Sequence, residues 1–144
     1  MEYYMENGGG QVNRTEEKAK RSSQQRRLIY ETLVSTTAHP DVESIFAEVR
    51  KKLPDIGIAT VYRNLRRLVA DGLVNTLETT KDCVHYDADV SNHAHFVCEK
   101  CGKIKDLFIA SPMSDAVEQL GYEVKREKLI FYGVCPECGR RNEN

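Results

Sequence analysis

Two Cys-x-x-Cys pairs constrain this chain more than any other feature. Cys98 pairs with Cys101 and Cys135 with Cys138, and a glycine follows each pair. A Cys-x-x-Cys turn aims both sulfurs at one point, and the glycine permits the positive φ that such turns often need. Two such turns give a tetrahedral shell of four thiolates, which predicts a structural Zn²⁺ site with no open position for chemistry. The ion would tie residues 94–105 to the C-terminal strand, in a half too small to build a large core.

The rest of the composition narrows the class of protein. The first ten residues are polar and glycine-rich, so no secretory signal is expected, and the thiols should stay reduced in the cytoplasm. No apolar run approaches the roughly 20 residues that a membrane-spanning helix needs. Hydrophobic residues make up 40% of the 144 and charged residues 30%, which is typical of a folded globular chain. The fifth cysteine, Cys83, stands apart from the two pairs and is interpreted as a small strand residue.

The net charge of −1 conceals an asymmetry between the two ends of the chain. Residues 10–75 carry 12 Lys and Arg against 8 Asp and Glu, whereas the remainder carries 9 against 14. The first part is therefore attractive to phosphate, and the second is rich in groups that bind metal ions.

Periodicity predicts an α+β chain in two parts. Apolar residues at helical spacing indicate helices over about 13–34, 42–53 and 58–71, with Asp41 and Gly57 as N-caps and Gly72 after the third helix. Alternation then indicates a hairpin of strands 73–79 and 83–87, which completes the element order of a winged helix-turn-helix. Farther on, strands are expected over 94–98, 103–109 and 122–134, with a helix over 113–120. We therefore divide the chain into a flexible arm (1–12), a winged-helix DNA-binding domain (13–88) and a small α/β dimerisation and metal-sensing domain with the four-cysteine zinc site (89–144).

A second group of metal-binding side chains lies just before the first cysteine pair. His93 and His95 share one face of a strand, because side chains alternate along it. The Cys98–Cys101 turn reverses the chain, so Asp106 should lie opposite His95. Asp87 and His39 are further candidates by residue type, and His85 is a weaker one. A solvated pair of histidines and an exposed carboxylate would fit the same pattern, so spacing alone leaves this site open.

The third helix has the features of a DNA-reading helix. Val61, Leu65, Leu68 and Val69 form its inward stripe, whereas no acidic residue occurs between residues 58 and 70. Basic and hydroxyl-bearing side chains on its outer side suit phosphates and base edges in a major groove. These candidate DNA contacts are Thr60, Tyr62, Arg63, Arg66 and Arg67, and phosphate contacts are also expected from Lys18, Lys20, Arg21, Arg26 and Arg27. So small a module predicts a two-fold dimer on an inverted repeat.

Several motifs in one order resemble the ferric uptake regulator family. They are the run Ile58-Ala59-Thr60-Val61-Tyr62-Arg63-Asn64-Leu65, His39-Pro40, His93-Ala94-His95 and Cys98-Glu99-Lys100-Cys101-Gly102-Lys103. The resemblance covers nearly the whole chain after the arm. Within the family it is nearest to the peroxide-sensing branch, because Asp87 and Asp106 stand where iron-sensing members tend to carry glutamates. Arg63 departs from that branch, whose members often carry asparagine there.

The resemblance implies a function and a ligand set. It implies a homodimeric repressor of palindromic double-stranded DNA operators that is not an enzyme. A regulatory Fe²⁺ or Mn²⁺ would bind His39, Asp87, His93, His95 and Asp106, and the structural Zn²⁺ would bind the four paired cysteines. With iron bound, peroxide would oxidise His39 or His93, release the metal and so release the DNA.

Three other interpretations fit parts of the pattern. A repressor of iron, manganese or zinc uptake could use the same ligands without peroxide chemistry. A non-haem iron oxygenase could use His93, His95 and Asp106 as a facial triad, although no substrate-pocket motif accompanies them. A zinc-ribbon adaptor would bind only other proteins.

Overall fold

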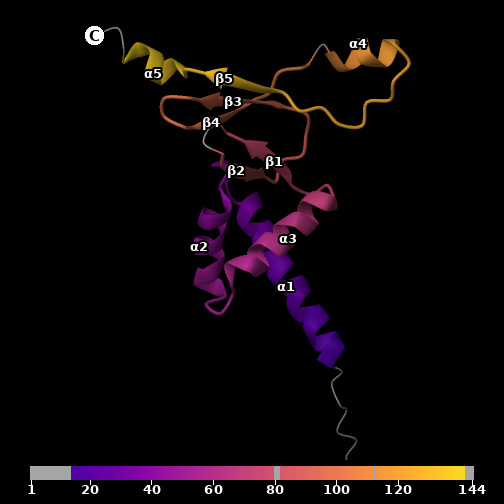
Figure 1. The fold of residues 1–144 in the computed structure, drawn as a ribbon, viewed down its shortest axis with the longest axis vertical. Coiled ribbons are helices and arrows are strands. Elements are labelled where there is room, and N and C mark those ends of the chain that lie inside the picture. Colours follow the sequence, from indigo (N-terminus) through magenta and orange to yellow (C-terminus); the bar gives the residue numbers. More distant parts are fainter. Residues whose placement is uncertain (1–13, 80–81, 112, 142–144) are drawn as a thin grey trace, which may run out of the picture.

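The computed structural model describes residues 14–79, 82–111 and 113–141. The predicted arm, 1–12, lies outside these residues, as do Thr80 and Lys81 of the expected hairpin turn. Figure 1 shows an elongated molecule, with three helices in one part, a small sheet in the other and a two-stranded hairpin between them. No helix within the described residues is both long enough and apolar enough to span a bilayer.

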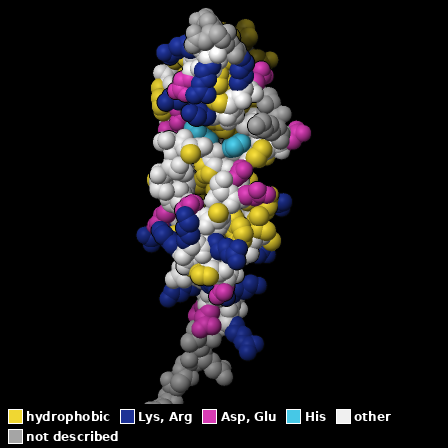
Figure 2. All heavy atoms as spheres, turned by 90° about the vertical axis from the view of Figure 1, so that its left-hand side faces the viewer, with side chains coloured by type: hydrophobic (Ala, Val, Ile, Leu, Met, Phe, Trp, Pro, Cys, Tyr) yellow, Lys and Arg dark blue, Asp and Glu magenta, His cyan; other side chains and the backbone are white. Residues whose placement is uncertain are grey.

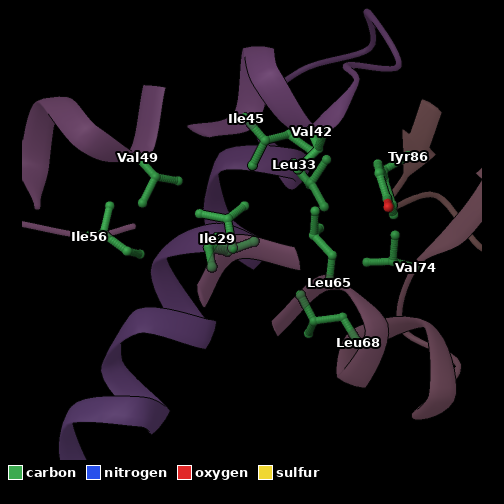
Figure 3. Packing of buried hydrophobic residues seen from close by; sticks show 11 residues of the cluster. Ile29, Leu33, Val42, Ile45, Val49, Ile56, Leu65, Leu68, Val74 and Tyr86 are labelled. Atoms are coloured by element: carbon green, nitrogen blue, oxygen red, sulfur yellow. The ribbon is translucent and has the colours of Figure 1, made fainter. Parts of the chain in front are cut away.

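The helices of the first part are α1 (Arg14–Val34), α2 (Val42–Lys52) and α3 (Ile58–Ala70). Their apolar stripes meet in one core, and Figure 3 shows side chains from all three helices pointing toward one another. The inward stripe predicted for α3 is confirmed, because Val61, Leu65 and Leu68 are buried. Two further core residues follow the helices in sequence: Val74, just before the first strand of the hairpin, and Tyr86, on its second strand.

The predicted helix ends are confirmed. The Asp41 carboxylate accepts a hydrogen bond of 2.9 Å from the Ser44 N–H. An N-cap side chain usually accepts such a bond, because the first N–H groups of a helix have no partner within the helix. Gly57 is the N-cap of α3, and Gly72 takes a φ of 74° just after that helix. A left-handed residue there lets the chain turn at once into the hairpin.

The hairpin consists of β1 (Asn75–Glu78) and β2 (Val84–Asp87), which pair antiparallel. Both strands are shorter than the sequence predicted, but their existence and pairing are confirmed. Three helices followed by this hairpin form a winged helix-turn-helix. At its far end, β2 delivers Asp87 to the boundary between the two parts of the molecule.

The second part is a three-stranded sheet of β3 (Ala94–Cys98), β4 (Ile104–Leu107) and β5 (Ile130–Gly133), in the order β4-β3-β5. The central strand β3 is antiparallel to β4 and parallel to β5. The short helix α4 (Met113–Gln119) lies between β4 and β5 in sequence, and α5 (Pro136–Arg140) follows the sheet.

Two expectations for this part were wrong. The strand expected over 122–134 is regular only from Ile130, because residues 122–129 form no strand pairing. Apolar residues between 122 and 129 are too widely spaced to mark where pairing begins. The glycine after the second cysteine pair, Gly139, lies inside the short helix α5 and does not take the positive φ expected at such a turn.

Apolar side chains remain exposed over the second part. Phe108 is 71% exposed and Leu120 is 76% exposed, although both are large hydrophobic residues. The other exposed apolar side chains after residue 89 are Val90, Ile109, Met113, Val117, Tyr122, Phe131, Tyr132 and Val134. Among the described residues of this part, only Ala94, His95, Val97 and Cys98 are buried. A surface of this kind is typical of a face that packs against another protein chain.

Candidate metal centres

The four paired cysteines converge at one end of the sheet. Cys98 ends β3, and Gly102, with a φ of 72°, donates its N–H to the Cys98 carbonyl to close the first turn. Cys135 caps α5, so that helix returns Cys138 toward the same point. The four sulfurs lie within 4.8 Å of one another. Ligands about 2.3 Å from one tetrahedral ion stand about 3.8 Å apart, and the sulfurs of Cys101 and Cys135 are 3.9 Å apart.

The chemistry of these thiols also suits a cation. Backbone N–H groups of Cys101 and Cys135 stabilise the Cys98 thiolate and lower its pKa to about 6. The hydrogen bond to Cys135, with burial and the other sulfurs, raises the pKa of Cys138 to about 12. The shell therefore favours one thiolate but resists becoming fully ionised. Because four thiolates this close repel one another, a divalent ion at their centre is the natural counter-charge.

A second cluster joins the two parts of the molecule. Asp87 comes from the end of β2 and His39 from the loop before α2, whereas His95 and Asp106 come from β3 and β4. Ligand atoms of these four residues lie within 4.8 Å of one another. The predicted pairing of His95 opposite Asp106 is confirmed by the register of β3 and β4. In Figure 2 the histidine side chains lie at the junction of the helical part and the sheet part.

Distances within this second cluster match a shell around one ion. His39 Nε2 lies 2.7 Å from Asp106 Oδ1 and 3.3 Å from Asp87 Oδ2. His95 Nε2 lies 2.9 Å from Asp87 Oδ2, and His93 Nε2 lies 3.2 Å from an oxygen of each aspartate. Ligand atoms about 2.1 Å from one ion, at right angles, stand about 3 Å apart. The four converging side chains, with His93 beside both aspartates, thus offer nitrogen and oxygen ligands, which suit Fe²⁺ or Mn²⁺ better than a closed zinc site.

Electrostatics in the cluster also favour a cation. Burial lowers the pKa of His39, but the hydrogen bond to Asp87 and the charges of both aspartates outweigh it, so the net shift is upward. Burial also lowers the pKa of His93, but the hydrogen bond to the Ser91 carbonyl and the same two carboxylates outweigh it, so this pKa rises as well. Burial acts against ionisation of Asp87, yet hydrogen bonds from His39 and His95 hold its pKa far below the usual range. The Asp87 carboxylate is therefore ionised, and it attracts either a proton or a metal ion to the imidazoles beside it.

His85 and Cys83, the remaining histidine and cysteine, lie outside both groups of converging ligand atoms. The Nδ1 atom of His85 lies 2.6 Å from the backbone carbonyl oxygen of His39 and is not one of the converging ligand atoms. Cys83 lies 3.8 Å from a carboxylate oxygen of Asp41, far in sequence from the four paired cysteines.

The outer face of α3 carries the side chains proposed to read DNA. Tyr62, Arg63, Arg66 and Arg67 are exposed, and Thr60 is half-buried. The Arg63 guanidinium donates to the Thr60 hydroxyl at 3.1 Å, so these two groups form one polar surface. Arg67 instead pairs with Asp71 at 3.2 Å, at the C-terminal end of the helix. The structure therefore distinguishes two arginines that the sequence treated alike.

Two residues near the clusters were not singled out from the sequence. The Phe108 ring lies against the His93 ring, with centroids 5.1 Å apart, at a position just after β4. The Tyr132 hydroxyl donates to the Glu78 carbonyl at 2.9 Å and so joins β5 to the hairpin outside the histidine cluster. The first contact follows from the register of β3 and β4, which carries residue 108 opposite residue 93, whereas no local spacing encodes the second.

Comparisons with known proteins agree with this architecture. The model of the family described as the ferric uptake regulator family matches residues 17–132. A peroxide operon regulator from Bacillus subtilis (strain 168) is 39% identical over 129 residues, which cover 86% of this chain and 88% of the relative.

Solved structures show the same fold. A peroxide stress regulator from Campylobacter jejuni has a TM-score of 0.75 and 28% identity, covering 86% of this chain and 96% of that one. The ferric uptake regulator of Helicobacter pylori, described with three functional metal-binding sites, has a TM-score of 0.69 and 25% identity, covering 88% and 89% of the two chains.

Proposed function

This chain belongs to the ferric uptake regulator family, and from that premise we propose that it is a metal-dependent, peroxide-responsive transcriptional repressor. One observation carries the proposal: His39 and Asp87 of the N-terminal part meet His95 and Asp106 of the sheet part in one cluster. The peroxide regulators among its relatives support the choice of signal. We place the boundary between the DNA-binding domain and the dimerisation domain near residue 88.

The ligand set, which we call the clasp, is proposed to link the two domains when it binds a metal ion. His39, Asp87, His93, His95 and Asp106 would hold Fe²⁺ or Mn²⁺. Without the ion, two carboxylates face three imidazoles. Only protons shared between these groups then link the two domains. With the ion, the same groups bind one centre, so the two domains take one relative orientation. Metal then favours the DNA-competent form through its higher affinity for that orientation.

The zinc site is proposed to hold the dimerisation domain in shape. Cys98 and Cys101 lie at the end of β3, whereas Cys135 and Cys138 follow β5. An ion bound to all four fixes this end of the sheet, in a domain with few buried residues. A zinc shell of four thiolates is closed and redox-silent, and it leaves the histidine cluster as the responsive site. The four cysteines must stay reduced to bind zinc. Because the cytoplasm keeps thiols reduced, we propose a cytoplasmic location.

DNA binding is proposed to need two copies of the chain. The exposed face of α3 supplies Thr60, Tyr62, Arg63 and Arg66, with Arg67 at its edge. The apolar side chains left exposed on the sheet part are the proposed contact between two copies. A two-fold dimer would present two α3 helices to successive major grooves of a palindromic operator.

Peroxide would act on the histidines of the clasp. Bound ferrous iron would activate hydrogen peroxide by donating an electron that it later recovers from the ring, so that in net the imidazole supplies both electrons that reduce the peroxide. His39 and His93 present their rings at the cluster with side chains 2% and 1% exposed, so an oxidant formed there meets them before it meets bulk water. One oxygen atom passes from peroxide to the imidazole, and the other leaves as water. The altered ring binds metal less well, the two domains separate, and the operator is released.

The test is metal content together with DNA binding of anaerobically purified protein. A duplex selected from random DNA by the Mn²⁺-loaded protein serves as the probe. We expect Fe²⁺ or Mn²⁺ to restore binding, and peroxide to abolish it only for the iron-loaded protein. Peptide mass spectrometry should then show one added oxygen on His39 or His93. Metal-dependent binding without that oxidation would leave a metal-responsive repressor and remove the peroxide claim.

A further inference from the structure

All four histidines of the chain lie at or beside the proposed clasp, and only His85 has no ligand role. His85 is half-buried on β2, two residues before Asp87. Its Nδ1 lies 2.6 Å from the backbone carbonyl oxygen of His39, 46 residues away in sequence. A carbonyl oxygen only accepts hydrogen bonds, so Nδ1 of His85 carries the proton and donates it.

The backbone that His85 contacts has an unusual conformation. His39 has a φ of 51°, in the left-handed region that residues other than glycine rarely adopt. Pro40 follows it, and a residue before proline otherwise favours an extended conformation. Conformations of this kind persist where surrounding contacts hold them. Here β2 provides those contacts, since the Tyr86 N–H also donates to the Pro40 carbonyl at 3.0 Å.

The ring of His39 lacks the support that a metal-binding histidine usually has. Such a histidine normally donates its second N–H to a carbonyl or carboxylate, which fixes the ring. His93 has this support, because its Nδ1 lies 2.8 Å from the Ser91 carbonyl oxygen. The Nδ1 of His39 is buried and has no hydrogen-bond partner among the described residues. The direction of the His39 ring therefore depends on the backbone that carries it.

We propose that His85 is a positioning residue, whose hydrogen bond to the His39 carbonyl holds the His39 imidazole at the regulatory metal site. The strand β2 then supplies one ligand, Asp87, and positions a second. The two ligands contributed by the DNA-binding domain move as one unit with the hairpin. This inference rests on the proposed function, because it concerns the same metal site.

Two substitutions of similar size separate the hydrogen bond from packing. In His85→Asn the side-chain amide keeps a donor where Nδ1 stood, whereas His85→Leu replaces it with a methyl group. Zinc-loaded, full-length protein is titrated with Mn²⁺ and the free ion is followed by electron paramagnetic resonance. We expect about ten-fold weaker binding for His85→Leu, as for other partners that orient a ligand, and near-native binding for His85→Asn. Zinc content should not change in either variant, and Val84→Leu, an exposed neighbour on β2, is the matched control.

A double-mutant cycle tests whether His85 acts through His39. In a His39→Ala background, His85→Leu should weaken Mn²⁺ binding no further. Equal effects in both backgrounds, or a Leu variant that binds as tightly as the native protein, would overturn the positioning role. A native protein that binds no Mn²⁺ would contradict the proposed function itself, and the positioning role with it.

The metal-free native protein gives an independent measurement. Imidazole ¹⁵N NMR reports which ring nitrogen of each histidine carries the proton. We expect His85 with its proton on Nδ1 before any Mn²⁺ is added. A neutral His85 protonated on Nε2 instead would overturn the inference without any variant.

Discussion

The Nε2 atom of His39 lies 2.7 Å from Oδ1 of Asp106, although 67 residues separate the two in sequence. His39 precedes the second helix of the winged-helix part, and Asp106 lies on a strand of the sheet part. Their contact is therefore a direct link between the proposed DNA-binding and dimerisation domains. A divalent ion placed between them would replace a proton-mediated link with a coordinated one.

Asp106→Asn should weaken binding of the regulatory metal. The amide keeps the size of the side chain but loses the charge that faces His39, His93 and His95. We expect Mn²⁺ affinity to fall at least about ten-fold, with metal-dependent DNA binding reduced in proportion. Mn²⁺ titration followed by fluorescence anisotropy of labelled DNA measures both effects. Asp115→Asn on α4 is the control, and an equal loss in that variant would contradict the assignment.

Acidic pH should weaken the same metal site. The pKa values of His39 and His93 are raised by neighbouring carboxylates and carbonyls despite burial. Each ring therefore keeps its proton to a pH above the ordinary value of 6.5. Metal binding needs neutral rings, so affinity should be full above the raised pKa and fall as the pH drops through it. Calorimetry of Mn²⁺ binding in two buffers of different ionisation enthalpy should show proton release near neutral pH. Binding that is independent of pH between about 6 and 8 would refute this.

Cys135→Ser should remove the structural zinc. Three remaining sulfurs no longer complete the tetrahedral shell, and this end of the sheet loses the link between β3 and the segment after β5. We expect loss of bound zinc, partial unfolding of the dimerisation domain and conversion to monomer. Elemental analysis, circular dichroism and light scattering after gel filtration measure these effects. Cys83→Ser, outside the four-sulfur group, should keep its zinc.

Arg63→Ala and Arg67→Ala should differ in DNA binding. Arg63 lies on the exposed face of α3 beside the Thr60 hydroxyl, whereas Arg67 is paired with Asp71. We expect Arg63→Ala to cost about 1–3 kcal/mol of operator binding and Arg67→Ala to cost less. Mn²⁺ affinity should not change in either variant, since both residues lie outside the clasp. Anisotropy titrations at fixed salt measure the difference, and a larger loss for Arg67→Ala would reverse the ranking.

Leu120→Glu should disrupt the dimer without unfolding the chain. Leu120 is 76% exposed, so a charged side chain there costs little within one copy. In a dimer that buries this apolar surface, an unpaired carboxylate is costly. We expect a monomer by light scattering, with zinc content and helical signal preserved. A variant that remains fully dimeric would place the contact elsewhere on the sheet part.

Sequence reasoning was most successful where the structure is local. Helix ends at Asp41, Gly57 and Gly72 follow from the hydrogen bonds and backbone conformations that those residues favour at those positions. The pairing of His95 with Asp106 follows from one reversal of the chain at a Cys-x-x-Cys turn. The start of β5 could not be predicted, because a parallel strand is defined by its distant partner β3 and by no turn of its own.

What the sequence determined by itself was the set of chemical groups: four sulfurs at turn spacing, four histidines, and a helix whose outer face is basic. Spacing also grouped the four sulfurs, and Asp106 with His95, but tertiary structure alone decided which distant groups join them. It brought His39 and Asp87 against the sheet, left His85 outside the ligand shell but against the His39 backbone, and paired Arg67 with Asp71. The physical reason is that spacing along a chain encodes periodicity and turns. The meeting of two distant segments depends instead on how the helices, hairpin and sheet pack together.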